Sequence, residues 1–128
     1  MTASFANVAL VALGGALGSV LRALLTWGVA ARLDGATMPA TLAANVLGSF
    51  VLGLVVAVTG SGAVAWRVFV VTGVCGGFTT FSTFSFEAVS AVEEGRVGLA
   101  LGYAGGSLML GGVALWGGLV VGRALVAR

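Results

Sequence analysis

Four long apolar runs follow one another along this chain of 128 residues, and they constrain its fold more than any other feature. A bilayer core of roughly 30 Å is crossed by about 20 apolar residues of helix, so each run is long enough to cross it once. The sequence therefore predicts an all-α integral membrane protein, with residues 1–128 forming a single four-helix membrane domain. The expected transmembrane helices cover residues 5–31, 41–59, 66–92 and 97–126.

Composition narrows the function classes. The chain is 59% hydrophobic and 8% charged, has no histidine and has Cys75 as its only cysteine. These counts exclude an intrachain disulfide, a Cys/His zinc site and a histidine-based catalytic triad. Six arginines occur singly, which gives neither a polybasic lipid patch nor a nucleic-acid face. We therefore expect no enzyme and no nucleic-acid partner, and any partner is expected to lie in the membrane.

The distribution of the arginines does not determine the orientation in which the chain inserts into the membrane. Four crossings put both termini on one side of the bilayer, together with Arg67, Arg123 and Arg128, while Arg32 and Arg96 lie on the other side. The excess that sets topology in other membrane proteins is nearly absent here. Either the count is noise in a chain with few charges, or the protein inserts both ways and pairs with an inverted copy of itself.

Glycines recur at a spacing of four residues, which predicts close packing between helices. With so few residues per chain, a bundle of two or more copies is also expected. The glycines at this spacing are Gly14, Gly18, Gly98, Gly102, Gly106, Gly118 and Gly122.

Polar residues in the second and fourth runs follow a helical period. Thr41, Asn45 and Ser49 recur every four residues along one face, and Tyr103 and Ser107 begin a similar stripe. A single serine or threonine usually bonds a carbonyl of its own helix. A carboxamide has two donors that its own helix does not satisfy easily, so contact with another helix and contact with a ligand stay equally open for Asn45.

The third run contains "CGGFTTFSTF", residues 75–84. Adjacent glycines followed by two threonines predict that the helix stops and restarts near Gly76–Thr79. Irregular backbone at this depth needs protein or a cavity to satisfy it. The freed carbonyls of residues 76–79 could hold a cation, while the donors of Thr79 and Thr80 could face an anion.

Aromatic rings and hydroxyls alternate after this break. Phe78, Phe81 and Phe84 fall three residues apart, close to one helical face. An aromatic stripe usually packs against lipid or the core, but hydroxyls interleave with these rings throughout. Ring edges carry the positive part of the quadrupole and favour an anion, whereas ring faces favour a cation.

Two charged residues lie inside the apolar runs. Arg22 either extends its side chain to the membrane interface or attracts anions. Glu87 follows the aromatic stretch by about one turn and can be a proton site, a cation ligand or an acceptor for neighbouring threonines. The sequence does not rank these roles.

Four motifs in order resemble one family, the small fluoride channels of the Fluc (CrcB) type, and together they touch all four runs. They are "GGALGSVLR" (residues 14–22), "PATLAANVLGSF" (residues 39–50), "GVCGGFTTFSTFSFE" (residues 73–87) and "YAGGS" (residues 103–107). The resemblance implies an antiparallel, dual-topology homodimer with two pores that passively export cytoplasmic fluoride. It also implies a central structural sodium ion, held by the carbonyls of Gly76 and Thr79 from both subunits.

The same resemblance implies roles for individual residues along the ion path. Asn45 would donate to fluoride, and the edges of Phe81 and Phe84 would line the pores. Arg22 would sit in an aqueous vestibule, and Glu87 would be an accessory residue near one end. The remaining pore residues implied are Thr80, Ser82, Thr83, Tyr103 and Ser107.

The chain departs from the family pattern at three positions. Ala23 stands where an aromatic often follows the arginine, and Ala40 replaces a common glycine after the proline. Gly111 falls where the polar track often continues with a hydroxyl. This last departure shortens the expected track unless water fills the space.

Two other functions compete with the channel as explanations of the sequence. A small dual-topology, proton-coupled exporter of organic cations would use Glu87 as its membrane carboxylate, with the phenylalanines as a cation-binding wall. Such an exporter is expected to carry its acid in the first run, where only Arg22 is found. A purely structural membrane subunit leaves Asn45 and the broken third run unexplained.

Overall fold

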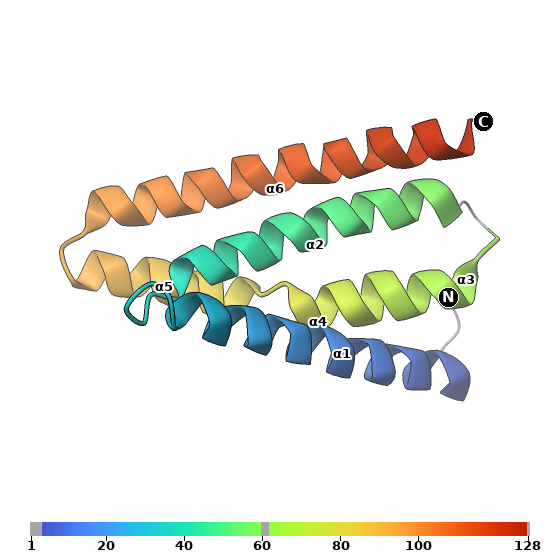
Figure 1. Ribbon diagram of the computed structural model, residues 1–128, viewed down its shortest axis with the longest axis horizontal. Coiled ribbons are helices and arrows are strands. Elements are labelled where there is room, and N and C mark those ends of the chain that lie inside the picture. The colour runs from blue at the N-terminus through green and yellow to red at the C-terminus, as the bar shows by residue number, and fades with distance from the viewer. Residues whose placement is uncertain (1–3, 60–61, 128) are drawn as a thin grey trace.

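The computed structural model describes residues 4–59 and 62–127, and these residues form a bundle of four long helical segments (Figure 1). Each segment is long and apolar enough to cross a membrane. The start of the first segment and the end of the last lie at the same end of the bundle, as four crossings require. The segments are α1 (Phe5–Ala30), α2 (Met38–Thr59), a third span from Val64 to Glu93, and α6 (Val97–Val126).

The third span is assembled from several pieces. It comprises α3 (Val64–Arg67), a π-helical stretch η1 (Val68–Cys75), α4 (Gly76–Phe78) and α5 (Phe81–Glu93). Thr79 and Thr80 between α4 and α5 are extended, with φ/ψ of −80°/157° and −150°/117°. The predicted break is therefore present, at the end of the predicted range and one residue beyond it.

The adjacent glycines do not stop the helix, contrary to the expectation from the sequence. Gly76 has helical φ/ψ of −62°/−36°, and α4 includes Gly77. The hydroxyl of Thr79 instead donates to the carbonyl of Cys75 at 2.9 Å, which closes the last turn of the first half. The threonines terminate the helix because their side chains offer hydrogen bonds that compete with its continuation.

The glycines serve close packing between the third span and α1. A Cβ atom on Gly77 would lie 3.1 Å from the Cα of Gly15, and one on Gly14 would lie 3.0 Å from the Cα of Gly73. A Cβ atom on Gly18 would lie 2.8 Å from the amide nitrogen of Phe78. The predicted packing through Gly14 and Gly18 is thus confirmed.

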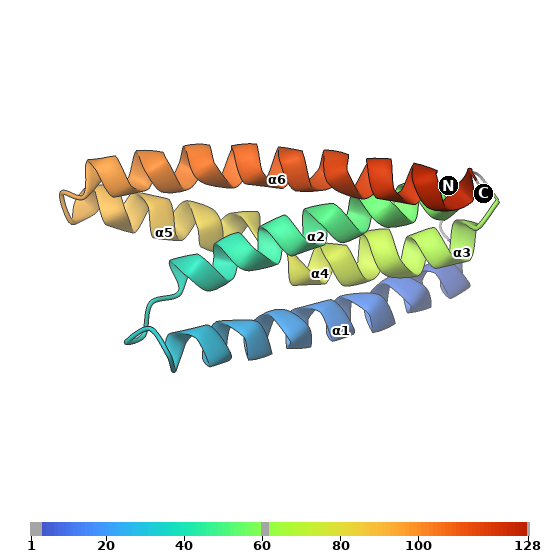
Figure 2. The ribbon, with the colours of Figure 1, turned by 45° about the horizontal axis from the view of Figure 1, so that its top comes forward.

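Glycine contacts also join α2 and α6, which lie side by side in Figures 1 and 2. A Cβ atom on Gly118 would lie 2.8 Å from the Leu54 nitrogen, and one on Gly122 would lie 2.9 Å from the Leu54 carbonyl oxygen. The three glycines predicted to pack in the first part of α6 behave differently, because an added Cβ would meet no neighbouring atom within 4 Å in the described part of one chain. These are Gly98, Gly102 and Gly106.

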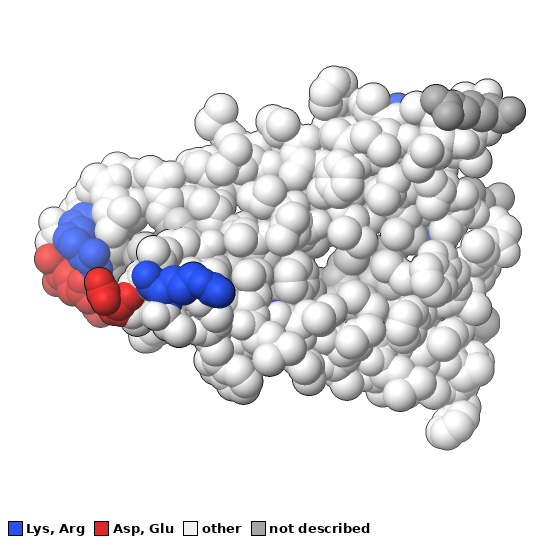
Figure 3. Space-filling model, in the orientation of Figure 1, with Lys and Arg blue, Asp and Glu red and all other residues white. Residues whose placement is uncertain are grey.

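The core is small and lies between α2 and η1, around Val55, Val70 and Cys75. Charged side chains gather at one end of the molecule, on the left of Figure 3, where the α1–α2 and α5–α6 turns lie. The rest of the face in view is almost free of charge, as a surface in contact with hydrocarbon requires. The exposed charged residues of these turns are Arg32, Asp34, Glu93, Glu94 and Arg96.

The start of the second helix differs more than any other from the predicted boundaries. The second helix begins at Met38, three residues before the predicted start, with Pro39 in its first turn, where its missing N–H costs no helical hydrogen bond. Gly95 joins α5 to α6 with a φ of +76°, a conformation that favours glycine. Arg128, counted above among the arginines of one side, lies outside the described residues.

Candidate functional site

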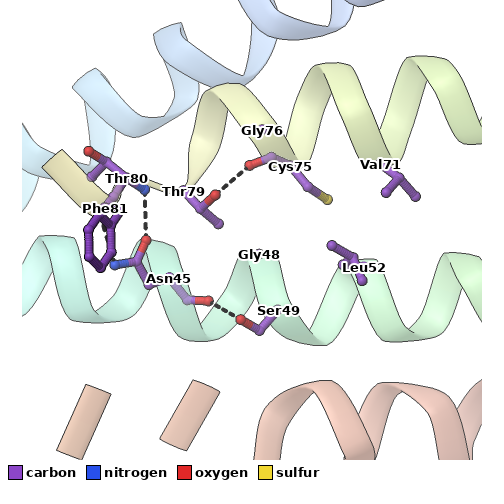
Figure 4. Close-up of a pocket in the computed structure, with 10 residues that line it drawn as sticks. All are labelled: Asn45, Gly48, Ser49, Leu52, Val71, Cys75, Gly76, Thr79, Thr80 and Phe81. Atoms are coloured by element: carbon purple, nitrogen blue, oxygen red, sulfur yellow. Dashed lines mark hydrogen bonds between the residues drawn. The ribbon is translucent and has the colours of Figure 1, made fainter. Parts of the chain in front are cut away.

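The side chain of Asn45 holds the backbone at the break in the third span (Figure 4). Its Oδ1 accepts a hydrogen bond from the Thr80 N–H at 2.8 Å, and its Nδ2 donates to the Thr80 carbonyl at 3.2 Å. Asn45 therefore makes the contact between helices that the sequence left open. A primary amide carries two N–H donors, so one stays available for a ligand.

The hydroxyl of Thr80 caps the N-terminus of α5. It accepts from the Thr83 N–H at 3.2 Å, donates to the Thr83 hydroxyl at 3.0 Å and lies 3.4 Å from the hydroxyl oxygen of Ser82. This is the usual role of a threonine at an N-cap. The predicted hydroxyl cluster is thus brought together, with Thr80 buried and Ser82 exposed.

Aromatic rings form a short series from α5 to α6. The ring centroids of Phe81 and Phe84 are 5.8 Å apart at 41°, and those of Phe84 and Tyr103 are 5.2 Å apart at 47°. The predicted stripe of three phenylalanines on one helix is wrong, because Phe78 belongs to α4, before the break. Phe81 is 80% exposed within one chain.

Two cavities lie on either side of Asn45, Ser49 and Phe81, which line both of them. The larger, of about 340 Å³, opens between α2 and the first half of the third span (Figure 4). The smaller, of about 190 Å³, lies between α2, α5 and α6. The smaller cavity is lined by Asn45, Ser49, Phe81, Phe84, Ala104, Ser107, Leu108 and Gly111.

Ser107 presents a hydroxyl to the smaller cavity. Its oxygen is buried and has no hydrogen-bond partner among the residues that the structure describes. A buried polar atom without a partner is rare in native proteins and needs an explanation, such as a bound ion or water. Tyr103 lies one turn earlier on α6, so the two predicted members of the polar track share a face of this helix.

Glu87 is buried, at 6% exposure, and is bonded on both oxygens. Oε1 accepts from the hydroxyls of Thr37 at 2.6 Å and Thr41 at 3.1 Å, and Oε2 accepts from the Tyr103 hydroxyl at 2.6 Å. The carboxylate thus ties α5 to α6 and to the start of α2. Of the roles left open, the structure displays that of a hydrogen-bond acceptor for neighbouring threonines.

The sequence analysis did not include Thr37 among the site residues, although the spacing of the polar residues indicates it. It precedes Thr41 by four residues and so extends the stripe of Thr41, Asn45 and Ser49 back by one turn. Its hydroxyl also lines a third cavity, of about 590 Å³, beside Glu87 at the charged end of the bundle. Glu94 and Arg96, which form an ion pair, line the same cavity.

Arg22 extends from α1 toward the break. Its Nε donates to the carbonyl of Gly77 at 3.1 Å. In an uninterrupted helix that carbonyl would accept from the N–H of Phe81, which here opens α5 instead. Arg22 therefore satisfies one of the carbonyls that the break leaves open, and its place in an aqueous vestibule stays a prediction.

The carbonyls of Gly76 and Thr79 also lose their usual helical donors. The Thr80 N–H, four residues after Gly76, donates to Asn45, and the Thr83 N–H, four residues after Thr79, donates to the Thr80 hydroxyl. Backbone carbonyls of this kind are suitable ligands for a hard cation. The two residues therefore fit the predicted sodium ligation, whereas Gly77 is engaged by Arg22.

Comparison with known proteins identifies relatives along most of the chain. Residues 9–119 match the family described as CrcB-like protein, Camphor Resistance (CrcB). A protein of Agrobacterium fabrum named fluoride-specific ion channel FluC is 48% identical over 124 residues, covering 93% of this chain and 98% of that protein. A protein of the same name from Thermus thermophilus is 49% identical over 119 residues, covering 91% and 94%.

A third relative, from Acidobacterium capsulatum and of the same name, is 42% identical over 120 residues, covering 91% of this chain and 96% of its own. With four helices able to cross a membrane and relatives named as channels, the chain is a multi-pass membrane protein. The matched residues 9–119 reach into all four helical segments, and the chain therefore belongs to the CrcB-like family.

Proposed function

We propose that this chain is a fluoride-selective ion channel that passively exports cytoplasmic fluoride across the cell (inner) membrane and so confers fluoride resistance. Relatives that are 42–49% identical over most of the chain carry the name fluoride-specific ion channel. A channel is not an enzyme and needs no catalytic residue, in keeping with the absence of histidine from the sequence.

The observation that carries the proposal is the chemistry of the smaller cavity. It brings together the amide of Asn45, the hydroxyl of Ser107 and the rings of Phe81 and Phe84 at the level of the break. Fluoride is small and holds its water tightly, so a pore has to replace that water with hydrogen-bond donors in a narrow space. Amide, hydroxyl and positive ring edges are donors of this kind.

The proposed assembly is an antiparallel homodimer with two pores. The nearly equal arginine counts on the two sides allow insertion in both orientations. A second copy would cover the exposed ring of Phe81, which lies beside Asn45 at the edge of the larger cavity. Small residues favour close approach of helices in membranes, and the open glycine face of α6 offers such a surface.

A structural sodium ion is part of the proposal. The carbonyls of Gly76 and Thr79 would hold it, because both have lost their helical donors to Asn45 and Thr80. When bound, the ion would supply fixed positive charge near the anion path and join the two subunits at the break.

The proposal is tested with purified protein in liposomes loaded with potassium fluoride or potassium chloride, with valinomycin to carry the counter-ion. The wild type is expected to release fluoride and retain chloride. Phe81→Ile and Phe84→Ile are each expected to slow fluoride release, because Ile keeps bulk but has no positive ring edge. Phe5→Ile, at an exposed position at the start of α1, serves as the matched control and should release fluoride like the wild type. Wild-type liposomes that retain fluoride would refute the proposal.

A further inference from the structure

We propose that Ser49 of α2 supplies the pore hydroxyl that α6 lacks at Gly111, so that Ser49 and Ser107 bind the permeating fluoride from opposite walls of the smaller cavity. The inference rests on the proposed function and assigns Ser49 as a further ion-binding residue. It follows from the closeness of Ser49 to Gly111 at the cavity that both residues line.

Gly111 and Ser49 face each other across the α2–α6 contact. Gly111 follows Ser107 by four residues, so both lie on the same face of α6. A Cβ atom on Gly111 would lie 3.6 Å from the hydroxyl oxygen of Ser49, the only neighbouring atom within 4 Å in the described chain. A hydroxyl carried by residue 111 would therefore enter the space that the Ser49 hydroxyl faces.

The hydroxyls of the two serines that line this cavity differ in their hydrogen bonds. The Ser107 oxygen is buried without a partner among the described residues. The Ser49 hydroxyl donates to the carbonyl of Asn45, one turn earlier on its own helix, at 2.7 Å. Such a back-bond within a helix is weak, and a hydroxyl can rotate about its C–O bond, so this donor can turn toward an anion in the cavity.

A purely local role for Ser49 is the simplest alternative, since hydroxyls often bond their own helix. Thr26, Thr59 and Ser85 make the same bond to the carbonyl four residues earlier. None of these three lines either cavity beside Asn45, whereas Ser49 lines both. Thr79 makes the same bond to Cys75 but lines only the larger cavity, so it is the lining of the smaller cavity that distinguishes Ser49 from these hydroxyls.

A double-mutant cycle tests the inference through fluoride release from liposomes. Ser49→Ala is expected to slow release about tenfold or more, because a hydrogen bond to a charged species is lost. Gly111→Ser alone supplies the reference rate for the cycle, and Gly111→Ser combined with Ser49→Ala should recover most of the rate that Ser49→Ala loses. Ser85→Ala removes an equally back-bonded hydroxyl from outside the cavity and should release fluoride like the wild type.

A second pair of variants separates ion binding from packing. Ser49→Thr keeps the hydroxyl, and Ser49→Val has the shape of the threonine variant without the hydroxyl. Only the valine variant should therefore lose fluoride release. Both variants should keep the melting temperature of the wild type in detergent. A wild type that releases no fluoride would refute the channel itself. A wild type that releases fluoride, with Ser49→Val equally fast or with the double variant as slow as Ser49→Ala, would overturn only the role of Ser49.

Discussion

The carboxamide of Asn45 bonds both the N–H and the carbonyl of Thr80, a residue 35 positions later in the chain, at 2.8 and 3.2 Å. Extended backbone inside a membrane is costly unless its polar groups find partners. Asn45 provides those partners from α2, and the third span can therefore be interrupted at the depth where the rings of Phe81 and Phe84 begin.

Asn45→Asp is expected to weaken both the break and the ion path. The aspartate can still accept from the Thr80 N–H, but it cannot donate to the Thr80 carbonyl, and its charge repels an anion. We expect a loss of about 1–3 kcal/mol in stability and nearly complete loss of fluoride release. Melting in detergent and efflux from liposomes measure the two effects. An Asn45→Asp channel as active as the wild type would contradict the role of Asn45.

Glu87→Gln separates a channel from a proton-coupled exporter. The glutamine oxygen can accept from Thr37 and Thr41, and its amide can donate to the Tyr103 oxygen, so the network persists. We expect stability to fall by about 1 kcal/mol and passive fluoride release to stay within about threefold of the wild type. An exporter that relies on this carboxylate would lose proton-driven exchange completely. Glu94→Gln, at an exposed position, is the matched control for loss of an acid.

Arg22→Gln is expected to destabilise the protein, because the Gly77 carbonyl loses its donor at the break. The expected loss is about 1–3 kcal/mol, since a partly buried carbonyl is left unpaired. Arg32→Gln is a matched control, because Arg32 also donates to a carbonyl, that of Gly28 at 3.1 Å, but at an exposed turn. Thermal unfolding in detergent should separate the two variants, and equal melting temperatures would contradict a role for Arg22 at the break.

Substitutions at two neighbouring glycines of α6, Gly118→Ala and Gly117→Ala, are expected to have opposite effects on stability. A Cβ atom at Gly118 would collide with the backbone of α2, whereas one at Gly117 would meet no neighbouring atom of the described chain within 4 Å. Gly118→Ala should separate the helices and cost about 1–3 kcal/mol. Gly117→Ala should be neutral or stabilising by up to about 1 kcal/mol, because alanine is the better helix former. Equal unfolding of the two variants would argue against close α2–α6 packing.

Removal of sodium should weaken the proposed dimer. If the carbonyls of Gly76 and Thr79 hold the ion, replacing sodium with N-methylglucamine should lower the melting temperature and shift the protein toward monomer. Light scattering after size-exclusion chromatography in each cation measures the oligomeric state. A dimer that is equally stable in both cations would reject the sodium site and leave the fluoride proposal standing.

Much of the site could be anticipated from residue type and spacing. Asn45 is conspicuous as a carboxamide in an apolar run, and the two threonines after a glycine pair indicated an interrupted helix. The exact break was not predictable, because Gly76 and Gly77 are intrinsically permissive yet both stay helical, and α1 packs against Gly77. Thr37 escaped notice because it lies in the turn before α2, outside the apolar run.

The sequence by itself determined the four crossings, since hydropathy is a local property and each run is long enough to span the bilayer. It also determined the family, because residues 9–119 match the CrcB-like family. Only the tertiary structure decided that Glu87 bonds Thr37, Thr41 and Tyr103, and that Arg22 reaches Gly77. These contacts join residues far apart in the chain, and they depend on how closely the glycine faces allow the helices to approach.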